Sequence, residues 1–423
     1  MNMNPESARG IDRRRLIEWG GLAAAGAPLV GTEFARAAPP TADSRVTAGP
    51  PGSGRVPPET RPGGAYDRFV AKLAAQDRFS GVVLLSYRGR TVLSRSYGMA
   101  DKERGIRNHE NVAFHLSSAS QPFLSVAILQ LVQRGKVSLS DPVGSHLEGV
   151  ATEIAEQVTI HHLLTSTSGI DAPMPDWQRV YHSRQEVHEV GEQWVRQARL
   201  MGVPGSGANA HLPGGGVGLA MAAQIVEVVS GMTYWDYTHE HIFERAGMTG
   251  SGFFTRTQWL TDARIAHPYM RQDDGSRVDA VRNLDKGSVS PPIRGRNPGR
   301  SFIGYASSDG FATAPDLARF AYALHDGTLL ERPYADLFAG AKLPGPGPAG
   351  FEAYTMPVSI IGGQWVIGRG GGAGGVGANW TVYPDTGWVG VVLSNYDDMP
   401  LLEICAREVE AVTGERVDLP GGG

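Results

Sequence analysis

Ser118 stands where a serine can act as a nucleophile, at the start of a predicted helix. The segment Phe114-His-Leu-Ser-Ser118-Ala-Ser-Gln121-Pro-Phe precedes apolar residues with helical spacing, Leu124, Ile128, Leu131 and Val132. Backbone N–H groups and the helix dipole at such an end favour a developing oxyanion. A structural interpretation competes, because Ser117, Ser118 or Ser120 also suits a helix N-cap. This segment alone leaves both interpretations open.

The elements that must position Ser118 are predicted from both ends of the chain. A helix is expected over 65–77, followed by strands Gly81 to Tyr87 and Arg90 to Tyr97. The chain closes with strands Gln364 to Gly368, Ala378 to Tyr383 and Trp388 to Asn395, with a glycine-rich turn after the first, and then with a helix opened by Pro400. Between these ends the apolar spacing is helical: one helix ends at Gly231, Thr233 caps another that runs to about Gly247, and Thr313 caps a third. We therefore predict an α/β fold of the α+β type. One antiparallel sheet is built from both chain ends and flanked by helices, and a mainly helical region, about 119–300, is inserted in a domain spanning 64–413.

The N-terminal residues are typical of a targeting segment. Residues 1–37 contain twin arginines at Arg13 and Arg14, an apolar run from Gly20 to Val30 and an A-x-A site at Ala35-Arg36-Ala37. Residues 38–63 are rich in Pro and Gly and are expected to form a flexible leader, and 414–423 a tail. We expect a twin-arginine-type signal peptide and a location outside the cell or at the exterior of its envelope. A disordered basic tail is the alternative.

Composition excludes several classes of function. The net charge of −4 offers no basic field for nucleic acid, and no later apolar run is long enough to span a membrane. Cys405, the only cysteine, cannot form an internal disulfide or a thiolate cluster, and its helical stripe predicts a place in the core. A Gly-x-Gly-x-x-Gly match at 370–375 is followed by a strand rather than a helix, and no HExxH occurs. No cofactor and no metal are expected.

Several segments together resemble one family. Phe114 to Val143 is similar to the nucleophile helix of the class C β-lactamase and penicillin-binding-protein family of serine hydrolases. Three other stretches, Thr159 to Ile170, Ser230 to Thr249 and Asp309 to Phe320, resemble later segments of the same family in the expected order. The resemblance covers roughly residues 65 to 413. It implies a β-lactamase/transpeptidase-like fold and an acyl-enzyme formed on Ser118.

The resemblance also implies a Ser-x-x-Lys motif, and here this sequence departs from the family. The match reads Ser118-Ala-Ser-Gln121, so a carboxamide that cannot take up a proton near neutral pH replaces the lysine. Each of the five lysines lacks a serine three residues before it: Lys72, Lys102, Lys136, Lys286 and Lys342. The motif has therefore not simply moved.

The two other family motifs are altered as well. The Tyr-x-Asn motif is lost in the stretch from Pro204 to Gly216, where His211 could replace the tyrosine as base or could be a surface-loop histidine. The Lys-Thr-Gly or His-x-Gly motif corresponds to Arg369-Gly370-Gly371, with Gly372 following. Arg369 could hold a substrate carboxylate or extend into solvent, and the glycines leave room for an oxyanion hole.

Three hypotheses for function follow. The first is an exported, β-lactamase-related serine hydrolase that is divergent at its active site and acts on an amide, ester or lactam through Ser118. The second is a non-catalytic protein that binds cell-wall peptides or a related ligand, and the third is a repurposed catalyst that tailors or cyclises a secondary metabolite. All three place a small molecule or peptide in the cleft. The sequence does not indicate an oligomeric state.

Overall fold

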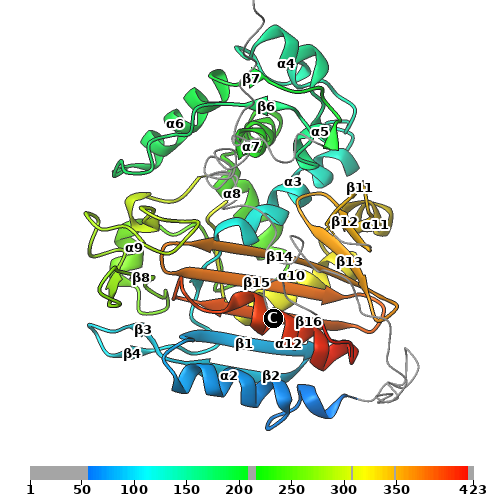
Figure 1. Cartoon of the computed structure of the whole chain (residues 1–423). Helices are drawn as coiled ribbons and strands as arrows, with labels where there is room; N and C mark the ends of the chain where they lie inside the picture. Colours follow the sequence, from blue (N-terminus) through cyan, green and yellow to red (C-terminus); the bar gives the residue numbers. More distant parts are fainter. Residues whose placement is uncertain (1–55, 208–215, 306–307, 347–348, 418–423) are drawn as a thin grey trace, which may run out of the picture.

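An eight-stranded antiparallel sheet is the central element of the computed structural model, which describes residues 56–207, 216–305, 308–346 and 349–417 (Figure 1). The strand order is β11-β12-β13-β14-β15-β16-β1-β2, so that β1 from the N-terminal part pairs with β16 from the C-terminal part, from Gly81↔Ser394 to Tyr87↔Trp388. The strands span Gly81–Tyr87 (β1), Arg90–Tyr97 (β2), Leu343–Pro344 (β11), Gly350–Glu352 (β12), Pro357–Ile361 (β13), Gln364–Ala373 (β14), Val376–Tyr383 (β15) and Trp388–Ser394 (β16). The predicted sheet built from both chain ends is confirmed.

Helices cover both faces of this sheet, which explains why β1 is an almost continuous apolar run. Val82 and Leu84 of β1 pack in a core with helices α3 (Gln121–Gln133) and α10 (Ala314–His325). Val83 and Leu85 point the opposite way, into a second core with α2 (Ala65–Ala75) and α12 (Leu401–Thr413). Figure 1 shows α2 and α12 together on that second face. Cys405 of α12 is buried in the second core, as predicted.

A mainly helical region lies beyond the β14 side of the sheet (Figure 1). Its helices are α4 (Thr152–Gln157), α5 (Ile160–Leu164), α6 (Arg184–Arg196), α7 (Gly216–Ser230) and α8 (Tyr234–Thr238) with the π-helical turn η6 (His239–Glu244). Two other helices are α9 (Arg256–Thr261) and α11 (Arg332–Ala339). The short strands pair two by two outside the main sheet: β3 (Met99–Asp101) with β4 (Ile106–Arg107), β5 (Phe114–His115) with β10 (Phe311–Ala312), β6 (Ile170–Asp171) with β7 (Arg199–Leu200), and β8 (Tyr269–Arg271) with β9 (Arg277–Asp279). Single turns of 3-10 helix are η2 (Pro58–Thr60), η3 (Ser117–Ser120), η4 (Val143–Ser145) and η7 (Pro298–Arg300). Among the described residues no one helix has the length and apolarity to cross a membrane; α7 with the segment Tyr234–Glu244 passes that test only as a pair bent by 80°.

The glycine-rich turn predicted after Gly368 is much shorter than expected. Strand β14 continues through Arg369 and Gly372 to Ala373, paired with β15, and the chain reverses at Gly374 and Gly375. Glycine weakens a strand by itself, yet here a neighbouring segment approaches the glycines closely. Arg369 therefore belongs to a strand and has a fixed direction.

Candidate active site

Ser118 lies in the 3-10 turn η3, between strand β5 and helix α3, and its residue is 5% exposed. Strand β5 is held by β10 through the pairs His115↔Phe311 and Phe114↔Ala312. Ser117 turns the chain out of the strand with a φ of 48°. The predicted position of Ser118 at the head of a helix is thus refined by one 3-10 turn, in which the Ala119 N–H donates to Leu116 O and the Gln121 N–H to Ser118 O.

Strand β14 presses against the Ser118 turn at a glycine. A Cβ atom built on Gly371 would lie 2.1 Å from Leu116 O and 2.9 Å from Ser118 N, so only glycine allows this approach. Ser117 Oγ donates a hydrogen bond to Gly372 O at 3.0 Å. Because the N–H and C=O of one strand residue point to the same edge, the Gly372 N–H also faces the serine turn.

Arg369 is hydrogen-bonded to Ser118 and to Gln121. Its Nε donates to Ser118 O at 3.3 Å, and its Nη2 donates to the Gln121 Oε1 atom. Burial lowers the pKa of Arg369 to about 10, opposed by the negative charge of Glu352 on β12. Burial likewise raises the pKa of Glu352, and Arg369 counteracts this. Arg369 does not extend into solvent, since it is 6% exposed.

This pairing redistributes the charge near the nucleophile. At neutral pH the cation sits on a strand, and the helix position that resembles the family's lysine presents an amide oxygen to it. A guanidinium cannot accept the serine proton, and neither can a carboxamide. Gln121 and Arg369 therefore act as a pair that holds the Ser118 turn, and neither can serve as a base.

A second set of groups lies on the other side of the serine turn. The His115 ring is buried and stacks on Trp259 with an interplanar angle of 2° and 5.5 Å between ring centroids. Its Nε2 atom lies 3.6 Å from Asp309 Oδ1. Burial lowers the pKa of His115, while Asp309 opposes that effect. The sequence analysis did not single out either residue, although His115 stands three positions before Ser118.

The predicted site residues therefore form two groups: those that the structure brings together, and His211, which it does not describe. Ser118, Gln121, Arg369, Gly370, Gly371 and Gly372 come together where β14 meets η3. His211, with the stretch expected to replace Tyr-x-Asn, lies outside the described residues. Glu352, His115 and Asp309 were missed, because they reach the site through strand pairing and tertiary packing that motif spacing does not show.

One group of residues has the composition of a metal site. The buried residues Asp101, His267 and Asp279 place their ligand atoms within 4.8 Å of one another. However, Arg282 donates to both carboxylates, at 2.8 Å to Asp101 Oδ2 and 2.5 Å to Asp279 Oδ2, and His267 Nε2 pairs with Trp259 O at 2.8 Å. The guanidinium supplies the positive charge that a metal ion would bring, so these residues do not fit a metal.

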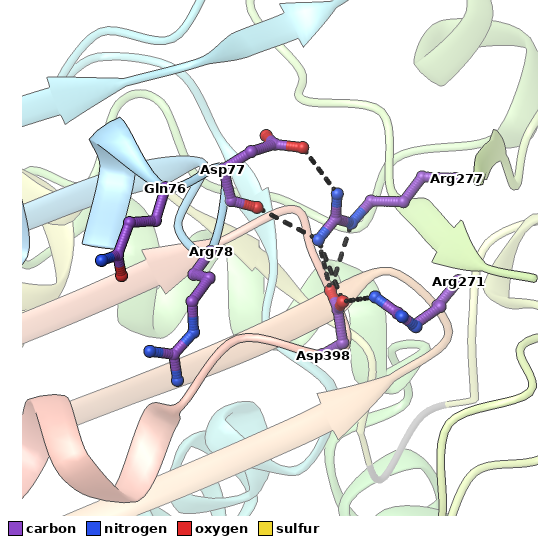
Figure 2. A pocket seen from close by; sticks show the side chains of 6 residues that line it. All are labelled: Gln76, Asp77, Arg78, Arg271, Arg277 and Asp398. Carbon is purple, nitrogen blue, oxygen red and sulfur yellow. Dashed lines mark hydrogen bonds and ion pairs between the residues drawn. The ribbon is translucent and has the colours of Figure 1, made fainter. Parts of the chain in front are cut away.

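A surface pocket carries a further charged cluster, which we call the Arg277 network: Gln76, Asp77, Arg78, Arg271, Arg277 and Asp398. Figure 2 shows Arg277 between Asp77 and Asp398, with Arg271 on the same Asp398 carboxylate. The network ties the end of α2 to β8, β9 and the loop after β16. None of its six members contributes to the Ser118 turn.

The structure thus has a serine at the head of a buried helix, in close contact with a strand of a large antiparallel sheet. The chain belongs to the beta-lactamase family, whose model matches residues 66–413. Two Bacillus subtilis (strain 168) proteins align over about half of their own length. The penicillin-binding-protein homologue PbpX is 28% identical over 265 residues, 62% of this chain and 59% of PbpX. Penicillin-binding protein 4* is 30% identical over 198 residues, 46% of this chain and 42% of that protein.

Further relatives include enzymes. Esterase EstB of Burkholderia gladioli is 27% identical over 305 residues, 66% of this chain and 76% of the esterase. Among solved structures, a penicillin-binding protein from Bacillus halodurans matches with a TM-score of 0.67 and 25% identity, covering 81% of this chain and 98% of that one. The D-amino acid amidase of Ochrobactrum anthropi SV3 shares the fold with a TM-score of 0.63 at 20% identity, covering 83% and 99%. The chain is thus similar to serine hydrolases and penicillin-binding proteins alike.

Proposed function

We propose that this protein attacks the carbonyl of an amide, ester or lactam with Ser118 and passes through an acyl-enzyme. The observation that supports this most directly is the contact between β14 and the serine turn. Gly371 lets the strand approach closer than any side chain would allow. We expect the N–H groups of Ser118 and Gly372 to point to one place beside this contact. Such donors stabilise the tetrahedral oxyanion whichever group removes the proton.

We expect the substrate, a small molecule or a short peptide, to bind beside the Ser118 turn. Arg369 is already engaged with Gln121 and the Ser118 carbonyl, so its remaining role toward substrate is electrostatic. Since the lysine is replaced, we expect acylation to be slower than with a complete Ser-x-x-Lys motif by about two to four orders of magnitude. The N-terminal twin arginines support export, with the enzyme working outside the cell or at the exterior of its envelope.

The locked Gln121–Arg369 pair favours a second candidate function. If no group serves as base, the same site binds a cell-wall peptide or related ligand without turning it over, or the site has been repurposed for tailoring or cyclising a secondary metabolite. Both alternatives retain the fold and the donors but leave Ser118 unacylated.

Intact-mass analysis after incubation with a fluorophosphonate or a penicillin separates these functions. We expect one adduct on the natural protein and none on Ser118→Ala. Ser120→Ala is the matched control, because it removes a buried hydroxyl of the same turn, one that donates to Ser117 O at 2.7 Å. An adduct that persists in Ser118→Ala, or a natural protein that stays unmodified, would overturn the proposal.

A further inference from the structure

Two facing residues next to Ser118 adopt a backbone conformation that their side chains disfavour. Ser117 has a φ of 48° and Asp309 a φ of 66°, both in the left-handed region that glycine adopts most readily. The Asp309 N–H donates to Ser117 O at 3.3 Å, which continues the pairing of β5 with β10. Unfavourable backbone conformations of this kind persist where the surroundings enforce them, and they cluster at functional sites.

The Asp309 carboxylate is directed at a histidine whose orientation is fixed. Nδ1 of His115 accepts the backbone N–H of Ser117 at 3.2 Å, so in the neutral ring the proton resides on Nε2, which faces Asp309 at 3.6 Å. Trp259 stacks on the ring, and Phe311 meets it edge-on at 5.0 Å. The Asp309 side chain is 22% exposed against 5% for His115, which leaves the carboxylate the more accessible member of the pair.

The negative charge of Asp309 shifts the pKa of two other groups. It raises the pKa of the Arg296 guanidinium, which burial lowers more strongly. It also adds to the rise in the pKa of Tyr305, for which burial is the main cause. The carboxylate thus stands among His115, Arg296 and Tyr305 beside the serine turn.

We propose that Asp309 is the base that replaces the missing lysine, with His115 as its positioning residue. This inference depends on the proposed acylation of Ser118. The β5–β10 register places Asp309 opposite Ser117, one residue from Ser118. We expect the Asp309 carboxylate to reach the Ser118 hydroxyl directly or through one water. The carboxylate accepts the Ser118 Oγ proton as Oγ bonds to the carbonyl carbon. It then returns that proton to the leaving amine or alkoxide as the bond to that group breaks. In deacylation it takes a proton from water, whose oxygen attacks the acyl carbon, and gives it back to Ser118 Oγ.

The left-handed backbone makes a discriminating experiment possible. Asp309→Gly removes the carboxylate and also relieves the unfavourable φ, so we expect its melting temperature not to fall below that of the natural protein. Asp309→Asn keeps the shape and loses only the charge. For both variants we expect the rate of fluorophosphonate labelling at Ser118 to fall by about 100-fold or more. We also expect Asp309→Asn to abolish the loss of rate at acid pH that a carboxylate base produces.

The matched control is Asp77→Gly, the same substitution at another left-handed aspartate, with a φ of 53°, in the Arg277 network. It should leave the labelling rate unchanged. Natural rates and an unchanged pH profile in both Asp309 variants would overturn this inference while the acyl-enzyme proposal stands. A natural protein that is never labelled would overturn both. A fall in melting temperature with normal labelling of the folded protein would show that the Asp309 carboxylate is structural.

Discussion

Asp77 and Asp309 are both aspartates with positive φ, yet their surroundings differ in a way that separates structure from chemistry. Asp77 follows the end of α2, where its N–H and that of Arg78 bond back to the carbonyls of Ala74 and Leu73, a helix ending that calls for a left-handed residue. Asp309 follows no helix and faces a second left-handed residue, Ser117. The first conformation has a local cause, whereas the second accompanies the pairing of β5 with β10 beside Ser118.

The charged partners of the two aspartates also differ, being closer at Asp77 than at Asp309. Asp77 accepts from Arg277 at 2.8 Å and from the Tyr396 hydroxyl at 3.0 Å, and Arg277 also binds Asp398 (Figure 2). Asp309 meets His115 at 3.6 Å, too long for a strong hydrogen bond. A network with close partners contributes to stability, and a looser pair leaves the carboxylate able to contact another group. Substitutions in the two regions should therefore affect different measurements.

Gly371→Ala should have the largest effect, because the added Cβ would meet Leu116 O at 2.1 Å and Ala119 N at 2.6 Å. We expect β14 to be forced away from the serine turn, with a loss of about 1–3 kcal/mol in the free energy of unfolding and of Ser118 labelling by at least about 100-fold. Labelling kinetics and urea unfolding measure the two effects.

Gly191→Ala, on helix α6, is the matched control for that substitution. A Cβ there would meet no heavy atom within 4 Å. It should keep both stability and labelling. If the two alanine variants behave alike, the close approach at Gly371 is not what assembles the site.

Much of the fold could be predicted from the sequence because local signals and burial agree. The strands β1 and β2 have the predicted bounds, and Thr313 caps α10 by accepting the Asp316 N–H. The helix expected from Thr233 to about Gly247 forms as α8, but it becomes π-helical from His239 to Glu244, a change that periodicity does not reveal. The predicted end of β14 was wrong. The glycines and the alanine after Arg369 suggest a turn, but most of them pair with β15 and therefore extend the strand.

The candidate site was predictable only in part. Ser118 and Arg369 could be found because family motifs occupy fixed sequence positions, but their mutual geometry depends on where β14 crosses η3. His115 and Asp309 are 194 positions apart and meet because β5 pairs with β10. No spacing rule connects them. A histidine just before a nucleophile, and an acid where the chain must turn with positive φ, are signals that gain meaning only in the folded chain.

Gln121→Lys and Gln121→Glu test the charge that faces Arg369 next to Ser118. The two variants should differ in their effect on the free energy of unfolding. Lysine would direct an ammonium at the buried Arg369 guanidinium, which now bonds the Gln121 amide oxygen, so we expect a loss of about 2–4 kcal/mol. Glutamate would keep the acceptor and add a charge-assisted bond, so its free energy of unfolding should lie within about 1 kcal/mol of the natural value or above it.

Neither variant should gain β-lactam hydrolysis, because the residues that a lysine base works with are altered as well. Chemical unfolding and nitrocefin turnover are the two measurements. Full hydrolytic activity in Gln121→Lys would show that the changes at Arg369 and in the Tyr-x-Asn stretch of the sequence matter less than we propose.

Asp398→Ala should have the smallest effect on Ser118 labelling. It tests the Arg277 network, the other region in the comparison with Asp309. Asp398 accepts from Arg271 at 2.7 Å and from Arg277 at 2.9 Å, and the Arg277 side chain is only 11% exposed. Leaving these donors with fewer partners should cost about 1–3 kcal/mol of unfolding free energy, while Ser118 labelling of the folded protein stays within about twofold. Asp273→Ala, at an exposed acid in the β8–β9 turn, is the control and should change stability by less than about 0.5 kcal/mol. A labelling defect in Asp398→Ala would mean that the Arg277 network is coupled to the serine turn through β8, β9 and the loop after β16. The residues around Asp77 and those around Asp309 would then form a single functional unit.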